Sequence, residues 1–246
     1  LVAPLPVGHE HRRVDDGVRR VDPTVGVVLE DNLVFPHKVV ERLQNEKATG
    51  FAGVPSTYAL LLSRVKLEDY DLSNLRYLTK AGGPMPIVTA NRLRAALPRA
   101  RLPLMYGQTE AFARLTCMDP DQLDLRPGSV GRPIADVEIQ GRPSDEAEPG
   151  YGEIWARGPG VMIGYWRDPE MTGATLQDGW LKTGDVGRLD PDGYLYVTGR
   201  RSDIIKVGAY RVHPGDIEEV ILEIPAVREV AVLALQDELL GQSIAA

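Results

Sequence analysis

A short stretch near the C-terminal end, Gly179–Val220, contains an acidic residue, a turn signal and a basic segment. Trp180 and the next residue have the composition of a strand end, and Thr183–Asp185 is predicted to form a sharp turn that projects the Asp185 carboxylate. A carboxylate held in this way can accept hydrogen bonds from both hydroxyl groups of a ribose. These residue types therefore indicate nucleotide binding.

A hairpin and a polar segment follow this acid. Pro191–Gly193 predicts a turn, because proline presets φ and glycine accepts a positive φ. Tyr194–Val197 has strand composition, and the polar run Gly199–Asp203 predicts a change of chain direction. A ribose-binding acid beside a basic joint indicates nucleotide chemistry with a moving part.

A second group of polar residues, Tyr106–Glu110, directly follows the apolar run Leu102–Met105. A glycine at a strand end lets the backbone approach a ligand, while threonine offers a hydroxyl to phosphate and glutamate offers a hard oxygen to Mg²⁺. Taken alone, the same residues are equally typical of a polar helix start capped by Thr109. The loop Ala81–Pro84 is similar: its small residues permit close packing of a flat adenine or acyl group, or form a plain turn.

Alternating strands and helices are predicted to position these loops. The sequence predicts strands near Val25–Leu29, Leu75–Leu78 and Leu102–Met105, another strand ending at Ala52–Pro55, and a helix over 87–97. A helix after Pro36 would bury Val39, Val40 and Leu43, and Ser56 would cap a further helix that carries Tyr58. This alternation predicts an α/β layer with parallel strands.

After Pro120 glycine and proline become dense and the strands become short, which predicts a β-rich, barrel-like subdomain. Ile217, Val220, Ile221 and Ile224 then share one face of a helix that Pro225 ends, and a strand is predicted over 227–235. Residues 1–24 show neither helical nor strand periodicity, so no element is predicted there. The predicted organisation is an unpatterned start (1–24), a core with an α/β part (25–119) and a β-rich part (120–201), and a small α+β lid (202–246).

Several segments, in order, resemble the signature motifs of the adenylate-forming (AMP-binding) enzymes, which include acyl-CoA synthetases, peptide-synthetase adenylation domains and firefly luciferase. One short motif is weak evidence, but this many in register rarely arise by chance. The resemblance covers roughly residues 25 to 246. The segments are Phe51–Tyr58, Tyr70–Leu75, Ala81–Pro84, Tyr106–Glu110, Arg126–Gly131, Gly152–Gly158 and Gly179–Val220.

The resemblance implies an acid–thiol ligase that activates a fatty or aryl carboxylic acid with ATP and Mg²⁺ to an acyl-adenylate and passes it to CoA. The acyl-CoA synthetase branch is favoured because Val212–Ile221 and Asp237–Gln242 look like that branch, and because Gln108 stands where peptide synthetases usually have proline. An adenylation domain that loads a carrier protein, or a non-catalytic nucleotide-binding remnant, stays open. A dinucleotide oxidoreductase is disfavoured, because no Gly-x-Gly-x-x-Gly follows an early strand.

The resemblance also assigns roles to residues. Asp185 would bind the ribose hydroxyls, with Arg200 as a second ribose or phosphate contact. The alternatives are that Asp185 only forms a turn and that Arg200 is a solvated surface charge. Thr109 would contact the α-phosphate, Glu110 would hold Mg²⁺, and Tyr106 would stack beside the adenine. The remaining nucleotide neighbours are Gly107, Gln108, Ala81, Gly82, Gly83 and Pro84.

Further roles concern the acyl group and the lid. Phe51, Val54, Tyr58 and Gly82 would line the acyl pocket, although ordinary core packing explains apolar residues at these places equally well. Ser202 stands at the hinge, where relatives more often have Asp or Lys, and Lys206 matches a lysine of the second half-reaction or is a surface lysine. Ala81 stands where the family usually has glycine.

The composition sets limits on the alternatives. The net charge of −7 disfavours a nucleic-acid partner, the single Cys117 excludes an internal disulfide and suits a reducing cytoplasm, and no apolar run would allow integral membrane contact. His9 and His11 lack a third ligand nearby, so a zinc site is not expected. The family's lysine-bearing phosphate loop and its catalytic lid lysine have no counterpart in the 246 residues, so we expect a fragment whose own activity is weak or absent.

Overall fold

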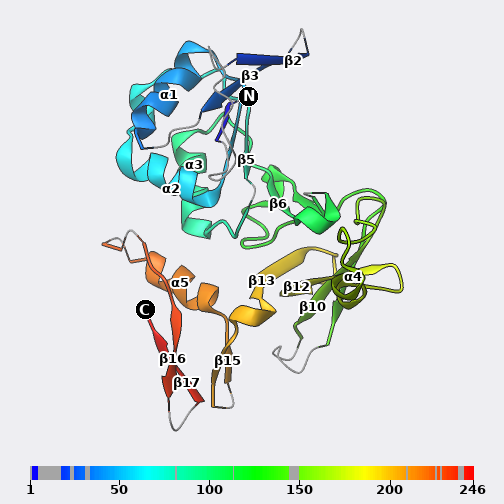
Figure 1. Ribbon diagram of the computed structural model, residues 1–246. Helices are drawn as coiled ribbons and strands as arrows, with labels where there is room; N and C mark the ends of the chain where they lie inside the picture. Colours follow the sequence, from blue (N-terminus) through cyan, green and yellow to red (C-terminus); the bar gives the residue numbers. More distant parts are fainter. Residues whose placement is uncertain are drawn as a thin grey trace. The chain divides into compact units, whose positions relative to one another are not determined.

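The computed structural model describes residues 2–4, 18–22, 25–30, 34–80, 82–112, 114–143, 150–208, 210–224, 226–227, 229–237 and 241–246. The chain divides into two compact units, residues 1–103 and 104–246. In Figure 1 the first unit runs from blue to green and the second from green to red. The more finely divided domain boundaries expected from the sequence, near 24, 119 and 202, stay predictions.

The first unit is built on a five-stranded sheet in the order β2-β3-β1-β4-β5. The neighbours β3, β1, β4 and β5 run parallel, and β2 is antiparallel at the edge, so the predicted parallel α/β layer is confirmed. The strand expected over Leu102–Met105 is not part of it, because it pairs antiparallel in a different sheet. The strands are β1 (Val2–Pro4), β2 (Val18–Asp22), β3 (Val25–Glu30), β4 (Gly50–Gly53) and β5 (Tyr77–Lys80).

Two of these strands correct the sequence analysis, because β1 and β2 lie within residues 1–24, where no element was predicted. Both are short, and both obtain their backbone hydrogen bonds from β3, with β1 also pairing with β4. Such strands are specified by their neighbours in the sheet rather than by a periodic pattern of their own.

The helices of the first unit are α1 (Pro36–Asn45), α2 (Pro55–Arg64) and α3 (Ile87–Ala96), with a 3₁₀ turn at Leu67–Asp69. Helix α1 begins at Pro36 and buries Val39, Val40 and Leu43, as predicted. The predicted cap of α2 is wrong: the helix begins one residue before Ser56, and its N-cap is Val54 without a side-chain hydrogen bond. Proline suits the first turn, because its missing N–H would have no partner there.

The described residues of the second unit form three sheets. An antiparallel sheet joins β6 (Leu104–Tyr106), β7 (Thr116–Met118) and β8 (Arg132–Pro133). The main sheet has the order β11-β12-β10-β9, and β13 also pairs with β12, so among the described residues it stays open at β9. Its strands are β9 (Glu138–Arg142), β10 (Gly152–Arg157), β11 (Leu176–Gln177), β12 (Trp180–Leu189) and β13 (Leu195–Arg200); the helix α4 (Pro169–Thr175) precedes β11.

The last part of the second unit has a four-stranded sheet in the order β15-β14-β17-β16 and the helix α5 (Pro214–Leu222). The predicted apolar face of α5 is present, but Val220 on it is exposed, and the helix ends at Leu222, before the predicted face residue Ile224. The strand expected over 227–235 begins only at Leu233. The strands are β14 (Ile205–Val207), β15 (Tyr210–Val212), β16 (Leu233–Asp237) and β17 (Gly241–Ala245).

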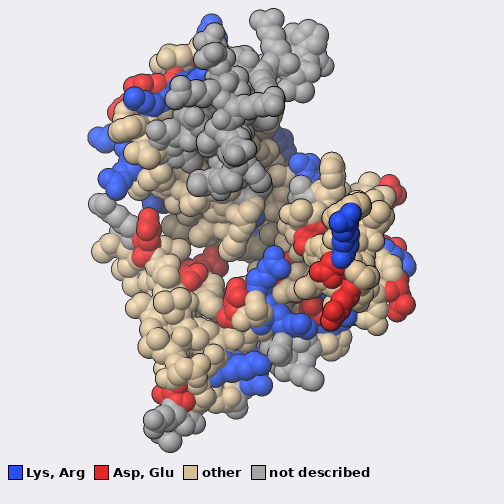
Figure 2. Space-filling view, viewed as in Figure 1, with Lys and Arg blue, Asp and Glu red and all other residues tan. Residues whose placement is uncertain are grey.

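The surface of the second unit mixes both signs of charge. Figure 2 shows Lys and Arg interspersed with Asp and Glu on the face it draws. Among the described helices, none combines the length and the apolar content needed to cross a bilayer.

Candidate functional site

The central residue of the candidate site is Asp185, which lies inside strand β12 rather than on a turn. The prediction of a turn over Thr183–Asp185 is therefore wrong, because these residues lie within a strand. The strand continues through Gly184, whose φ of 72° kinks it locally. Glycine adopts this left-handed conformation without the steric cost that a Cβ would bring. The kink places Asp185 opposite Arg200 in the pairing of β12 with β13.

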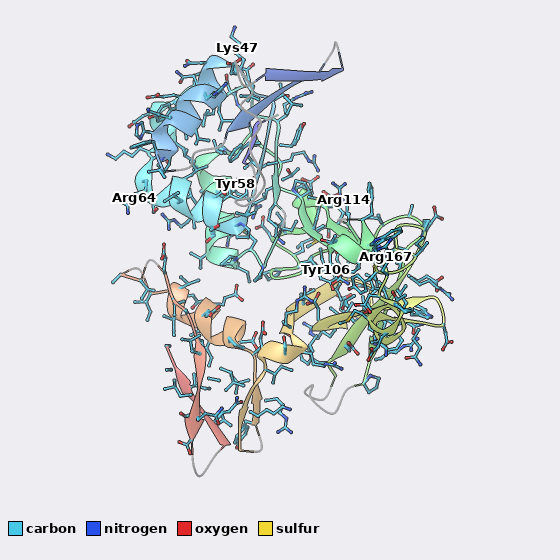
Figure 3. The ribbon with its side chains drawn as sticks, viewed as in Figure 1. Lys47, Tyr58, Arg64, Tyr106, Arg114 and Arg167 are labelled. Carbon is cyan, nitrogen blue, oxygen red and sulfur yellow. The ribbon has the colours of Figure 1, made fainter. Side chains whose placement is uncertain are left out.

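Both oxygens of the Asp185 carboxylate have protein partners. The Tyr106 hydroxyl donates to Oδ2 over 2.6 Å, and the Arg200 Nε lies 3.0 Å from Oδ1. The Asp185 side chain is only 9% exposed, whereas that of Arg200 is 54% exposed. Figure 3 labels Tyr106, which comes from β6, near the β12–β13 hairpin. The structure thus brings together three of the predicted nucleotide residues.

A fourth residue, Thr183, fixes the backbone on both sides of the kink. Its hydroxyl donates to the Ile154 carbonyl over 2.6 Å and accepts from the Asp185 N–H over 3.1 Å. Its carbonyl accepts from the Arg200 guanidinium over 3.1 Å. Sequence analysis missed this role and that of the Tyr106 hydroxyl, because neither leaves a local signal: Tyr106 and Asp185 are separated by 79 positions.

Burial dominates the protonation equilibria of this cluster. It raises the pKa of Asp185, although the hydrogen bond from Tyr106 and the charge of Arg200 act in the opposite direction. Burial also raises the pKa of Tyr106, and the negative charge of Asp185 adds to that shift. Tyr106 therefore stays a protonated donor, and the charged form of Asp185 depends on its two partners.

The hairpin that carries Asp185 and Arg200 is fastened by the motif Arg126–Gly131. Arg126 forms ion pairs with Asp190 and Asp192 in the hairpin turn. The Ser129 hydroxyl donates to the Leu195 carbonyl over 2.9 Å. The segment Arg126–Gly131 therefore stabilises the hairpin that carries Asp185 and Arg200.

Two close approaches complete this attachment. Arg126 also lies over the Tyr194 ring at 4.3 Å, and a Cβ added to Gly131 would lie 2.1 Å from the Cys117 carbonyl. The turn predicted at Pro191–Gly193 is confirmed, since the Gly193 N–H donates to the Asp190 carbonyl over 2.9 Å.

The second predicted ligand, Glu110, lies in a 3₁₀ turn formed by Thr109–Ala111. Its Oε1 accepts a hydrogen bond from the Tyr165 hydroxyl over 2.8 Å, and this bond raises the pKa of Tyr165. Thr109 is exposed and is the first residue of the turn, so it is not its cap. Gly107 and Gln108, between Tyr106 and this turn, are half-buried.

These donors fit a Mg²⁺ ion in one specific way. Among the described residues there is no group of three or more His, Cys, Asp or Glu side chains able to enclose a metal. Magnesium typically binds through one or two carboxylates together with substrate phosphates and water. Glu110, with the adjacent Thr109 hydroxyl, matches that donor set.

The hinge and lid residues predicted from the sequence lie around one cavity of about 780 Å³. Ser202 is exposed in the 3₁₀ turn Arg201–Asp203 and donates to Asp203 Oδ1 over 2.9 Å. Lys206 is exposed on β14. The cavity is lined by Gly184, Arg200, Arg201, Ser202, Ile204, Lys206, Gly208, Gln236, Gly241 and Gln242.

The candidate acyl-pocket residues of the first unit fall into two classes. Phe51 and Tyr58 are 1% and 0% exposed, and their rings pack edge to face at 5.7 Å. The Tyr58 hydroxyl donates to the Thr79 carbonyl over 2.6 Å (Tyr58 is labelled in Figure 3). Such contacts favour core packing for both aromatic residues.

The other two residues remain accessible. Val54 is 39% exposed, and a Cβ built on Gly82 would lie 3.7 Å from its Cγ1. Gly82 and Gly83 both have positive φ, and Pro84 is exposed. Ala81 lies outside the described residues. The loop therefore has the glycine-dependent conformation that close approach of a flat ligand requires.

Comparison with known proteins gives one family match and several relatives. The family model described as "AMP-binding enzyme" matches residues 23–166. A long-chain-fatty-acid–CoA ligase of Bacillus subtilis is 34% identical over 86% of this chain and 38% of its own length. The chain thus spans about two fifths of that curated relative.

Solved structures resemble the fold as well. The amide bond synthetase McbA of Marinactinospora thermotolerans is 37% identical, with a TM-score of 0.78 over 89% of this chain and 44% of that one. The o-succinylbenzoate CoA synthetase of Bacillus subtilis, solved with its acyl-adenylate intermediate, is 31% identical, with a TM-score of 0.75 over 89% and 44% of the two chains.

Proposed function

The chain belongs to the AMP-binding enzyme family, and from this membership we propose that the protein activates a carboxylic acid with ATP and transfers the acyl group to the thiol of CoA. Relatives with acid–CoA ligase names support the reaction type. The residues that carry the proposal are Tyr106, Asp185 and Arg200, because they form a pre-assembled acceptor for the ribose of a nucleotide.

The reaction has two steps. In the first, a carboxylate oxygen of the acid attacks the α-phosphorus of ATP, the bond to the β-phosphate oxygen breaks, and pyrophosphate leaves. In the second, the thiol sulfur attacks the acyl carbon, the carbon–oxygen bond to phosphate breaks, and AMP leaves with its electron pair while the thiol loses its proton. Catalysis of this type consists mostly of positioning and charge neutralisation.

The candidate site residues of the second unit have distinct tasks in this reaction. Asp185 binds the ribose hydroxyls, and Arg200 holds that carboxylate and extends toward the nucleotide. Thr109 contacts the α-phosphate, and Glu110 is the protein ligand of Mg²⁺, which neutralises charge on the phosphates when it is bound. Lys206 and the hinge at Ser202 serve the second step.

The thiol of CoA is the first of three candidate acceptors for the acyl group. The resemblance to an amide bond synthetase at 37% identity favours an amine as a second candidate, since an amine attacks the same acyl-adenylate. A carrier-protein thiol is the third. The acid is a fatty or aryl carboxylate, because relatives with names of both kinds match this chain to a similar degree.

Titration calorimetry of the purified chain with AMP and with non-hydrolysable acyl-adenylate analogues tests the proposal. We expect saturable binding that Asp185→Ala weakens by about 100-fold, and tighter binding of the analogue whose acyl group matches the substrate class. Absence of any binding by the folded chain would contradict the proposed nucleotide site.

Turnover assays then separate the acceptors. Formation of a thioester from ATP, acid and CoA supports the ligase. Amide formation with an added amine, but no thioester, favours the second candidate. Binding of the analogue without pyrophosphate release in any mixture would identify a nucleotide-binding remnant instead.

A further inference from the structure

The Tyr106 hydroxyl donates a 2.6 Å hydrogen bond to the one acid that is expected to meet the ribose. We propose that Tyr106 is a positioning residue: its hydroxyl fixes the plane of the Asp185 carboxylate, and the preference for a ribose over a deoxyribose depends on that hydroxyl. This inference rests on the proposed function and assigns a second task to a ring expected only to stack beside adenine.

The hydrogen-bonding capacity of the carboxylate explains why such positioning matters. An ionised carboxylate has about four acceptor positions on its two oxygens. Tyr106 occupies one on Oδ2 and Arg200 one on Oδ1, so one position per oxygen remains. Two neighbouring hydroxyl groups need two acceptors at a fixed separation, and the remaining positions supply them only while the carboxylate plane is held.

Of the two partners, Tyr106 is the one able to hold that plane. The terminal torsion of an aspartate is broad, so the carboxylate turns easily unless an outside group fixes it. The Arg200 side chain is long and more than half exposed, so water competes for its hydrogen bonds even though its guanidinium also donates to the Thr183 carbonyl over 3.1 Å. Tyr106 has a rigid ring, and its own backbone is fixed by β7 and by a 2.7 Å hydrogen bond from the Leu115 N–H to its carbonyl.

The setting also favours a short, persistent bond. Asp185 is buried, and its N–H and the preceding residues are tied to Thr183 and β10, so the carboxylate has little freedom to move with its backbone. A hydrogen bond to a charged group in such surroundings contributes about 1.5–3 kcal/mol. Loss of one such bond to a ribose hydroxyl corresponds to about a 10- to 150-fold change in affinity.

The test compares the affinity of the chain for AMP and for 2′-deoxy-AMP and 3′-deoxy-AMP by titration calorimetry. The main variant is Tyr106→Phe, which keeps the ring and removes only the hydroxyl. The matched control is Tyr196→Phe, which removes a hydroxyl from β13 of the same hairpin. Thermal melting verifies that each variant is folded.

We expect the unmodified chain and Tyr196→Phe to prefer AMP over each deoxynucleotide by about tenfold or more. Tyr106→Phe should lower that preference to about threefold or less while AMP itself still binds. An unchanged preference in folded Tyr106→Phe would overturn the inference but leave the nucleotide site intact. Failure of the unmodified chain to bind AMP would overturn the proposed function and this inference with it.

A second variant keeps the test decisive if Tyr106→Phe does not fold. In Arg200→Gln the carboxylate loses its other partner, and we expect weaker AMP binding with the deoxynucleotide preference retained within about threefold, since Tyr106 still fixes the plane. Collapse of the preference in Arg200→Gln would assign the positioning to Arg200 and refute the role of Tyr106.

Discussion

The two carboxylates assigned to the nucleotide occupy opposite settings within the second unit. Asp185 is buried on the ten-residue strand β12, and partners from β6 and β13 hold its two oxygens. Glu110 lies on a three-residue 3₁₀ turn, is half-buried, and has one oxygen held by Tyr165. The same kind of acid is thus fixed on a framework in one place and carried by a short turn in the other.

The difference follows the ligand that each acid is expected to meet. Two vicinal hydroxyl groups have a fixed separation, so an acceptor that is already aligned loses little entropy on binding. A Mg²⁺ ion arrives with water and phosphate oxygens, which adjust to a carboxylate on a less rigid turn. The turn after Glu110 is correspondingly open, since Phe112 has a φ of 49° and is 84% exposed.

The largest expected effect is a loss of stability caused by a substitution at Gly131, which lies in the segment that supports the Asp185 hairpin. Gly131→Ala would force a Cβ to 2.1 Å from the Cys117 backbone at a φ of 90°, so we expect a loss of about 4 kcal/mol in the free energy of unfolding, measured in urea. Gly193→Ala is the matched control: it has a φ of 80° but no atom within 4 Å, and should cost only about 1–2 kcal/mol. Equal costs would show that the contact with Cys117 is unimportant.

The next effect tests the comparison directly. Asp185→Ala should weaken AMP binding by about 100-fold, because hydrogen bonds to a charged acceptor are lost. Glu110→Ala, measured by the same titration without Mg²⁺, should change AMP binding by less than about threefold. A reversed order of the two variants would remove the distinction between the fixed and the adaptable acid.

A pH series sharpens the role of burial at Asp185. Burial raises its pKa above the ordinary value of 3.8, and ribose hydroxyl groups bind the ionised form. Affinity for adenosine, which has no titrating phosphate, should therefore fall as the pH falls through the raised pKa and recover above it. A constant affinity at every pH above 3.8 would contradict this account; Asp185→Asn should show no such titration.

Removal of the Arg126 ion pairs with the hairpin turn should have a moderate effect on stability. Arg126→Met loses the ion pairs to Asp190 and Asp192 while keeping an unbranched side chain over Tyr194, so we expect a measurable loss in the free energy of unfolding that is larger than in the control. Arg132→Met, which also lies over the Tyr194 ring, is the control and should cost less than about 0.5 kcal/mol. Equal losses would assign the stabilisation to the ring contacts alone.

The smallest expected effect concerns Glu110, the acid on the short turn. Tyr165→Phe removes the hydroxyl that donates to Glu110 Oε1, and the Mg²⁺ concentration for half-maximal stimulation of ATP binding should rise by less than about fivefold. A larger rise would show that Glu110 needs a fixed orientation as much as Asp185 does.

Features set by a few neighbouring residues could be predicted from the sequence. The start of α1 at Pro36, its buried face, the turn at Pro191–Gly193 and the parallel layer all follow from periodicity and from the φ preferences of proline and glycine. The motif order identified the family, because functional loops keep their residue types. The prediction of a cap at Ser56 was wrong because Pro55 already begins the helix. The prediction of a turn at Asp185 was wrong because the glycine kink lies within a paired strand.

Only the tertiary structure decided which motif residues touch one another. It placed the Tyr106 hydroxyl on Asp185, tied Arg126 to the hairpin turn, and put Phe51 and Tyr58 into the core of the first unit. It also paired β1 and β2 with β3, although neither has a pattern of its own. The physical reason is the same in each case: these contacts join residues far apart in the chain, and their free energy comes from strand pairing and burial that no local stretch of sequence encodes.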